Sequence, residues 1–394
     1  MSHRNVTALV AADDLLTETL QRLAERTVRG RRASGVLLGV ESADGSTSVR
    51  VASGDASPDV PYFIASITKM FTSAVTLQLV DEGRLRLDDR VVPLLPDLDL
   101  ARLHVHDGVD ATDRLEVHHL LHHTSGLADY FGEGIEDQLA GGEDRAYSIQ
   151  DTVDIARIAG AAFRPGDRDG RRSRYSDTNY QLLTGLIEAV TGQGYGEVVA
   201  ERIIEPLDLL GTYVVPATTD HRTPLILRSG DQPLSIPQAL ASERGAGGIV
   251  STLDDQLRFS RAFHDGELFA GGLDRAVPCW NRVQSFAIGY GHGVMRYRLP
   301  RWLTGRRVPE MFGHSGTTAS FLFHVPDLGC HIAGSFNQFA DAARPFRLLP
   351  RVAGAIAAHE SEVTLARPHR VMPCVAGAIA AHGSEVTLAR PLRA

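Results

Sequence analysis

The sequence predicts an α/β protein of two lobes, with a sheet assembled from both ends of the chain and a helical lobe between them. Patterns typical of short strands occupy residues 35–52 and return after residue 285. Between them, from residue 66 to about residue 210, the signals are mostly helical. Because a sheet must bury its apolar faces against other elements, the simplest arrangement joins both strand regions in one sheet packed with helices.

The first elements are a helix and a hairpin. Leu15, Leu20 and Leu23, with Glu and Arg between them, are typical of an amphipathic helix that Gly30 ends. Residues 35–41 and 48–52 then form two apolar runs on either side of a polar segment. This pattern predicts a β-hairpin.

The later elements include two clear helices and three strand-like runs. Apolar residues at helical spacing over 179–190, followed by Gly192, predict one helix. Thr252, three residues before Asp255, predicts a second helix that runs to His264 and begins with a capping box in which Asp replaces Glu. The expected strands cover residues 286–295, 320–325 and 330–336.

Composition and charge restrict the class of protein. The 394 residues are 43% hydrophobic and 22% charged, close to the average for globular chains. A net charge of -8 has the wrong sign for a nucleic-acid partner. Cys279, Cys330 and Cys374 are too widely spaced to suggest a disulfide framework or a metal knuckle. With Asp13 and Asp14 interrupting the first apolar run and no stretch of roughly 18 apolar residues, we expect no membrane span and a cytoplasmic location.

We expect one domain over residues 1–350 and a C-terminal helix with a duplicated tail over 351–394. The sheet lobe should comprise about 10–60 and 285–350, and the helical lobe about 66–280. Residues 351–370 and 374–393 match at 17 of 20 positions. Two copies are too few for a solenoid, so we interpret them as a tandem duplication.

The segment that begins at Ile64 carries the strongest signal for chemistry. Ser66 stands at a predicted helix start and Lys69 follows three residues later, which places the hydroxyl and the amine on one face. A serine becomes nucleophilic when a neighbouring base removes its proton, and a partly desolvated lysine can help to do so. Taken alone, the pattern also fits a capping serine before a surface lysine.

Two further segments strengthen this pattern. Residues 174–180 precede the strong helix, and residues 312–318 lead into a strand. With Ser66 and Lys69 they have the order and approximate spacing of the three motifs of the active-site serine penicillin-recognising enzymes, which the chain resembles. The resemblance is to the branch of class C β-lactamases, D-alanyl-D-alanine carboxypeptidases, D-aminopeptidases and esterases. It implies the two-lobe β-lactamase/DD-peptidase-like fold, with an antiparallel sheet flanked by helices plus a helical lobe.

The resemblance covers most of residues 10–350 and implies roles for individual residues. Ser66 would be the acylated nucleophile, Lys69 its proton partner, and Tyr175 a general base or relay. Nearby lysine charge would lower the pKa of the Tyr175 phenol towards the working pH. Residues 120–127 and 245–252 resemble structural stretches of the same branch.

The third motif implies how substrate is held. His314 stands where most β-lactamases carry lysine and where histidine is common in peptidases and esterases. Gly316 would let the strand approach the substrate without a Cβ. The backbone N–H groups of Ser66 and Thr317 would form the oxyanion hole. The expected substrate-binding residues are Asp177, His314, Ser315, Gly316 and Thr317.

Asp177 is the departure from the family pattern, which usually has asparagine two residues after the tyrosine. An amide can donate a hydrogen bond to a substrate carbonyl, whereas an ionised carboxylate only accepts. A carboxylate within about 4 Å of Lys69 would also favour its ammonium form. β-Lactam hydrolysis is therefore less expected than a differently selective acyl transfer, and loss of activity is the other alternative.

Two rival patterns predict other chemistry. Residues 313–317 are one glycine short of the nucleophile elbow G-x-S-x-G around Ser315, and the helix and strand alternation that should follow the elbow is missing. The histidine pairs His118/His122 and His119/His123 have the spacing of zinc ligands on a helix. A glutamate between them in the H-E-x-x-H manner is missing, so a solvated or core histidine face is the favoured interpretation.

The sequence therefore predicts a serine hydrolase that acts on a small ester or amide through an acyl-enzyme on Ser66. An esterase or a D-amino-acid or D-peptide amidohydrolase is preferred, and a β-lactamase or DD-carboxypeptidase is the alternative. A catalytically silent ligand-binding relative is the alternative of another class. The expected partner is a small-molecule ester, amide or D-peptide, and the chemistry needs no metal or organic cofactor.

Overall fold

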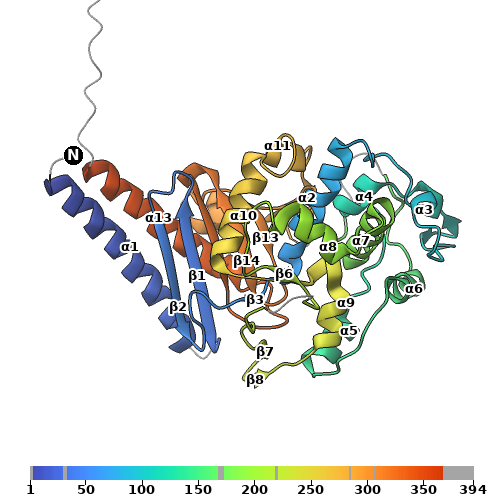
Figure 1. Cartoon of the computed structure of the whole chain (residues 1–394), viewed down its shortest axis with the longest axis horizontal. Coiled ribbons are helices and arrows are strands. Elements are labelled where there is room, and N and C mark those ends of the chain that lie inside the picture. Colours follow the sequence, from blue (N-terminus) through green and yellow to red (C-terminus); the bar gives the residue numbers. More distant parts are fainter. Residues whose placement is uncertain are drawn as a thin grey trace, which may run out of the picture.

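The computed structural model describes residues 3–29, 33–166, 173–217, 221–283, 285–305 and 307–366. Figure 1 shows a sheet lobe, formed by strands from both ends of the chain, beside a lobe that is mostly helical. The main sheet has eight strands in the order β10-β11-β12-β13-β14-β15-β1-β2. All neighbouring strands are antiparallel, so the predicted antiparallel sheet is confirmed.

The hairpin near the start of the chain joins strands that come more than two hundred residues later. Leu37 of β1 pairs with Ser335 of β15, and Val40 pairs with Ile332. The strands of the main sheet are β1 (Gly35–Ser42), β2 (Ser48–Gly54), β10 (Asn281–Arg282), β11 (Ile288–Tyr290), β12 (Met295–Tyr297), β13 (Met311–Ser315), β14 (Ser320–Val325) and β15 (Cys330–Ser335).

Helices cover both faces of this sheet. α1 (His3–Arg29) and α13 (Pro345–Ala366) lie side by side on one face, and α10 (Leu253–Asp265) packs on β1, β14 and β15. Val36 and Leu38 of β1 belong to the core under α1 and α13, whereas Leu37 belongs to the core on the other face. The continuous apolar run of β1 follows from burial on both sides.

The helical lobe consists of several helices packed around α2 and α7. Its helices are α2 (Thr68–Asp81), α3 (Val91–Leu94), α4 (Val117–Leu121), α5 (Glu133–Ala140), α6 (Ile149–Ala159), α7 (Asp177–Thr191), α8 (Tyr195–Val199) and α9 (Pro237–Gly247). The short helices α11 (Gly272–Ala276) and α12 (Arg301–Thr304) come later in the chain.

Short strands and single turns complete the described structure. A three-stranded sheet joins β3 (Tyr62–Phe63), β9 (Ile249–Ser251) and β6 (Tyr213–Val214). Two small pairs are β4 (Val105–His106) with β5 (Val109–Asp110), and β7 (Arg228–Ser229) with β8 (Gln232–Pro233). The turns are η1 (Ala65–Ile67), η2 (Thr112–Arg114), η3 (Ala200–Ile204) and η4 (Pro326–Leu328).

Most predicted elements are confirmed, and two need correction. The single strand expected over 286–295 is two strands, β11 and β12, because the chain turns back at Gly293 (φ 71°). Thr252 caps α10 as predicted, with its Oγ1 accepting from the N–H of Asp255 at 3.2 Å. The capping box is incomplete, because the Asp255 carboxylate binds Gly211 and Thr212 instead.

The C-terminal helix α13 begins at Pro345 and contains most of the first repeat copy. The second copy, residues 374–393, lies outside the described residues. Among the helices that the structure describes, none has the length and apolar character to cross a membrane.

Candidate active site

Ser66 lies in the turn η1, between the sheet and the helical lobe, and only 8% of it is exposed. The residue before it, Ala65, has a left-handed backbone (φ 47°), which is strained for a residue with a side chain. Because Ser66 lies inside η1, it does not cap α2, whose N-cap residue is Ile67. The alternative of a simple capping serine is wrong.

The sheet holds this strained turn by direct contacts from the β13–β14 connection. Thr318 Oγ1 donates to the carbonyl of Phe63 at 2.7 Å, and Ser320 Oγ donates to that of Ile64 at 2.7 Å. A Cβ on Gly316 would come within 2.6 Å of the Ile64 carbonyl oxygen and 2.8 Å of the Ala65 Cβ. The close approach that requires glycine at 316 is therefore an approach to the segment that carries Ser66.

Lys69 is fully buried and is held by contacts from three parts of the chain. Its Nζ lies 3.0 Å from Ser66 Oγ, 2.6 Å from the carbonyl oxygen of Ala246, and 2.5 Å from Oδ1 of Asp177. The separation of about 4 Å or less that pairing of Asp177 with Lys69 requires is therefore met. The ammonium is thus paired with a carboxylate directly beside the serine.

Tyr175 completes the group around Ser66. Its hydroxyl is hydrogen-bonded to Ser66, and its ring lies 5.1 Å from Lys69 Nζ. The predicted lowering of its pKa is wrong: burial, and then the negative charge of Asp177, hold the pKa of Tyr175 well above 10. The aspartate that replaces the family asparagine therefore helps to keep Tyr175 a neutral phenol.

The loop before residue 130 positions the start of α7, which carries Asp177. The N–H of Asp177 donates to Oδ1 of Asp129 at 2.9 Å, and Ser176 Oγ donates to the carbonyl of Ala128 at 2.9 Å. His123 Nδ1 accepts from the N–H of Ser176 at 3.2 Å, and its ring packs on Tyr175 at 4.4 Å between centroids. These contacts fix Tyr175 and Asp177 relative to each other.

Two carboxyl groups beside the site were not predicted from the sequence. Burial, and then the charge of Asp177, raise the pKa of Asp129 to about 7 and that of Glu243 to about 8. Neither belongs to a catalytic motif. The available signal was their position, because Asp129 follows the stretch 120–127 and Glu243 precedes the stretch 245–252 by two residues.

A small pocket opens at Ser66, and its walls are mostly apolar. Asp177 and Glu243 are the acidic residues of its lining, and Thr317 lies there as predicted. Ala65, Gly247 and Thr318 also contribute to the lining. The apolar side chains that line it are Phe63, Phe131, Leu139, Ile236, Ala239, Leu240 and Phe339.

His314 and Ser315 are in β13 and are not among the residues that line this pocket. His314 is fully buried, with Nε2 3.0 Å from the Tyr290 hydroxyl and Nδ1 2.7 Å from the carbonyl oxygen of Ser315. Burial, and then the charge of Lys69, lower the pKa of His314 to about 3, so its ring is neutral. Ser315 Oγ contacts Met295 Sδ at 3.9 Å within an antiparallel sheet, which excludes the strand–turn–helix of a nucleophile elbow.

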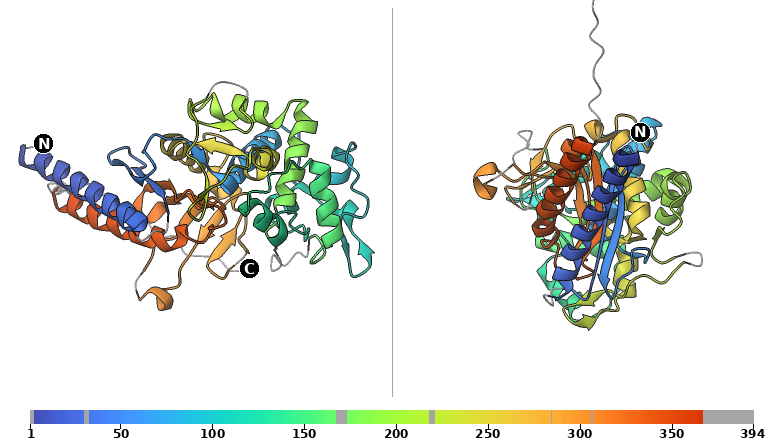
Figure 2. Two further views of the ribbon diagram at one scale, coloured as in Figure 1. Left: turned by 90° about the horizontal axis from the view of Figure 1, so that it is seen from below. Right: turned by 90° about the vertical axis from the view of Figure 1, so that its left-hand side faces the viewer.

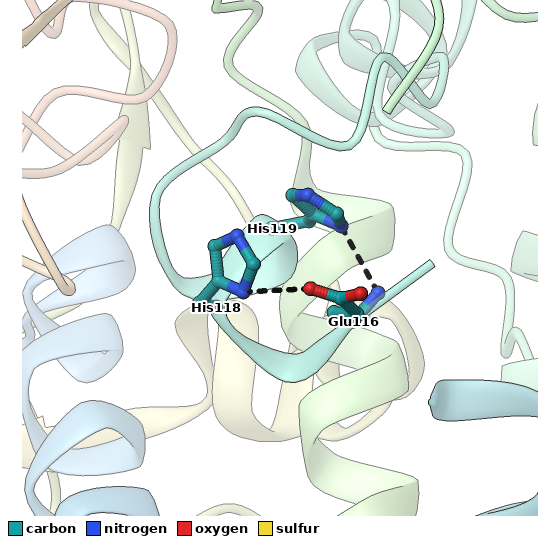
Figure 3. Close-up of side chains that lie close together, drawn as sticks. All are labelled: Glu116, His118 and His119. Atoms are coloured by element: carbon teal, nitrogen blue, oxygen red, sulfur yellow. Dashed lines mark hydrogen bonds and ion pairs between the residues drawn. The ribbon is translucent and has the colours of Figure 1, made fainter. Parts of the chain in front are cut away.

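His118 and His119, the first members of the predicted histidine pairs, lie at the start of α4 and do not line the pocket at Ser66. Figure 3 shows Glu116, His118 and His119, whose possible ligand atoms lie within 4.8 Å of one another. The N–H of Glu116 donates to Nδ1 of His119 at 3.0 Å, and His118 Nδ1 lies 3.1 Å from the carbonyl oxygen of Leu87. Burial lowers the pKa of His119 to about 3. Because its ring is neutral and Nδ1 is an acceptor, Nε2 carries the proton and no nitrogen lone pair is left for a metal.

Comparison with known proteins places the whole arrangement in context. The family described as Beta-lactamase matches residues 20–355. Penicillin-binding protein 4 of Amycolatopsis lactamdurans is 27% identical over 67% of this chain and 68% of its own length. A D-alanyl-D-alanine-carboxypeptidase/endopeptidase of Escherichia coli (strain K12) is 24% identical over 66% of this chain and 65% of its own length.

Solved structures have the same fold. A D-stereospecific amidohydrolase from Streptomyces sp. superposes with a TM-score of 0.68 at 27% identity, over 84% of this chain and 98% of that one. The D-amino acid amidase from Ochrobactrum anthropi SV3 superposes with a TM-score of 0.70 at 22% identity, over 88% of this chain and 99% of that one. The two-lobe fold expected from the sequence is confirmed.

Proposed function

The chain belongs to the Beta-lactamase family, and from this membership we propose that it hydrolyses small amides or esters through an acyl-enzyme on Ser66. One observation carries the proposal: Ser66 Oγ lies 3.0 Å from Lys69 Nζ and is hydrogen-bonded to Tyr175 at the wall of an open pocket. Serine acylation requires neighbouring groups that exchange the serine proton, and Lys69 and Tyr175 are placed to do so.

In the proposed reaction Ser66 Oγ attacks the acyl carbon, and the bond from that carbon to the leaving nitrogen or oxygen breaks. The serine proton passes to Lys69 Nζ as that ammonium passes one of its own protons to the Asp177 carboxylate, which is the member of the group formed with Lys69 and Tyr175 that can accept one. Tyr175, kept neutral by its raised pKa, is placed to donate a proton to the leaving group. The N–H groups of Ser66 and Thr317 would hold the oxyanion, and water then releases the acid.

The pocket favours an acyl group with an apolar side chain, because most of its lining residues are apolar. Amides of D-amino acids are the preferred class, since a similar protein from Streptomyces is a D-stereospecific amidohydrolase. β-Lactams are the less favoured alternative: Asp177 is paired with Lys69 and, as a carboxylate, offers no donor to a substrate carbonyl.

A substrate panel tests the proposal directly. The purified protein is assayed with p-nitrophenyl esters, D-amino-acid amides and nitrocefin, and then labelled with a fluorophosphonate and weighed as the intact protein. We expect turnover of an ester or amide that exceeds turnover of nitrocefin, and one label on Ser66. A protein that binds these compounds without turnover or label would instead be the catalytically silent relative.

A further inference from the structure

We infer that Glu243 binds a free ammonium group of the substrate, so that the acyl group transferred to Ser66 is that of an amino acid with an apolar side chain. This inference rests on the proposed acyl transfer at Ser66. It concerns selectivity, and Glu243 is assigned a binding role rather than a role in the chemical step.

The first observation is position. Glu243 lines the same pocket as Ser66 and Thr317, together with the apolar side chains that would contact the rest of the acyl group. It lies near the end of α9, three residues before Ala246, whose carbonyl oxygen accepts from Lys69. A ligand in contact with Ser66 therefore shares a small space with the Glu243 carboxylate.

The second observation is that Asp177, the other acidic residue of the pocket, is already in use. Its carboxylate is 2.5 Å from the ammonium of Lys69, so it is committed to an internal ion pair. Glu243 instead accepts a hydrogen bond from the neutral phenol of Tyr130 at 2.7 Å. The neighbouring Arg244 directs its guanidinium to the carbonyls of Tyr147 and Ser242. The pKa of Glu243 is about 8, so the group is mostly protonated near neutral pH. It is the acidic group of the pocket whose ionisation a bound cation would favour.

The third observation is the charge balance around it. The charge of Asp177 disfavours ionisation of both Asp129 and Glu243, and the charge of Lys69 opposes this effect on each of them. Like charges gathered in a partly desolvated site raise each other's energy, and an added cation relieves that repulsion. A substrate ammonium next to Glu243 would supply this cation.

Glu243 is also held in place before any substrate arrives. Gln181 Nε2 donates to the Tyr130 hydroxyl at 3.1 Å and to the carbonyl of Ser242 at 2.9 Å. Because Tyr130 accepts from Gln181, its own proton is directed to Glu243. A carboxylate oriented by such a network loses little freedom on binding a cation.

The test uses two substrates that differ only in the ammonium group, D-phenylalanine p-nitroanilide and 3-phenylpropionyl p-nitroanilide. We expect the wild-type protein to favour the first, and Glu243→Gln to lower its kcat/KM about tenfold or more while changing that of the second by less than about twofold. The amide still accepts from Tyr130, so the network is kept. Glu205→Gln, an exposed glutamate, removes the same charge elsewhere and should leave both values unchanged.

A second measurement needs no variant. D-phenylalaninamide and 3-phenylpropanamide are compared as inhibitors of wild-type turnover of a neutral p-nitrophenyl ester, and the amine should bind about tenfold more tightly. Equal inhibition, or an equal loss on both anilides in Glu243→Gln, would overturn the inference while ester turnover and labelling of Ser66 leave the proposed function intact. Absence of both turnover and label in the wild type would overturn the two together.

Discussion

His122 and His123 are neighbours in the sequence, but they belong to two different regions of the protein. His123, with a left-handed backbone (φ 57°), packs its ring on Tyr175 and Tyr290 behind the candidate active site. His122 lines a separate cavity together with His118, His119, His292 and Cys279. The second region therefore also gathers several residues of reactive type.

The difference between these regions lies in how their groups are paired. In the active-site region a serine, an ammonium and a carboxylate are in direct contact. In the histidine region burial lowers the pKa of His122 to about 4, and its Nδ1 lies 2.9 Å from the amide nitrogen of Asn281. Reactive residue types therefore indicate a catalytic site only where a nucleophile contacts a charged partner. The following substitutions test this difference between the two regions.

Replacing the nucleophile should have the largest effect. Ser66→Ala should lower kcat for the best ester or amide at least about a thousandfold and abolish the fluorophosphonate adduct, because the attacking atom is lost. Intact mass and steady-state kinetics measure both. Ser315→Ala is the matched control and should keep measurable activity, since its hydroxyl donates to Met295 Sδ. Loss of activity in Ser315→Ala with activity kept in Ser66→Ala would reverse the assignment.

Asp177→Asn should change the pH profile and the selectivity, each by about tenfold or more at pH 7. The charge of Asp177 contributes to the raised pKa of Tyr175, so removing it lowers that pKa. If the rate follows ionisation of the Tyr175 phenol, the activity of the wild-type protein rises towards alkaline pH. The activity of Asp177→Asn should then begin to rise at a lower pH. Acylation of Ser66 by penicillin should also increase, because the amide restores a donor.

The opposite outcome for Asp177→Asn would identify a different role. If the Asp177 carboxylate holds a substrate amine, the variant should lose activity on amino-acid amides while neutral esters are spared. Assays of one ester, one amino-acid amide and one penicillin separate the two results. Identical pH profiles and unchanged selectivity would contradict both roles of Asp177.

Asp129→Asn should stabilise the fold at high pH by about 1 to 2 kcal/mol. The folded pKa of Asp129 is about 7, against 3.8 in the unfolded chain, so the folded state retains a proton that the unfolded state has released. Stability is therefore lost as pH rises from about 4 to about 7, and the variant avoids this loss. Urea unfolding at pH 4 and pH 8 measures the difference. Asp97→Asn, at an exposed site, should show no such gain at pH 8.

His122→Asn should have the smallest effect, and with the opposite pH dependence. The folded pKa of His122 is about 4, below the 6.5 of the unfolded chain, so its contribution to stability is lost as pH falls from about 6.5 to about 4. The variant should gain about 1 kcal/mol relative to the wild type on going from pH 8 to pH 5. Thermal unfolding at the two pH values measures this gain. A large loss of kcat in His122→Asn would show that the two regions are coupled.

The sequence by itself predicted most of the elements and the contact between Ser66 and Lys69. Helical spacing over 179–190 and the apolar run at 35–41 depend only on neighbours in the chain, and both elements were predicted within a few residues. The spacing of Ser66 and Lys69 predicted that they share one face, and in the structure Ser66 Oγ lies 3.0 Å from Lys69 Nζ.

Only the tertiary structure decided how these groups are charged and what surrounds them. A pKa depends on burial and on charges that arrive from distant segments, so the sign of the shift at Tyr175 could not be obtained from Lys69 alone. Glu243 reaches the pocket from α9, more than 170 residues after Ser66, and carries no motif. Gly316 was predicted to approach the substrate, whereas the structure shows that a Cβ there would meet Ile64 and Ala65, which depends on how two segments pack. Local patterns fix local geometry, whereas electrostatics and packing are properties of the folded chain.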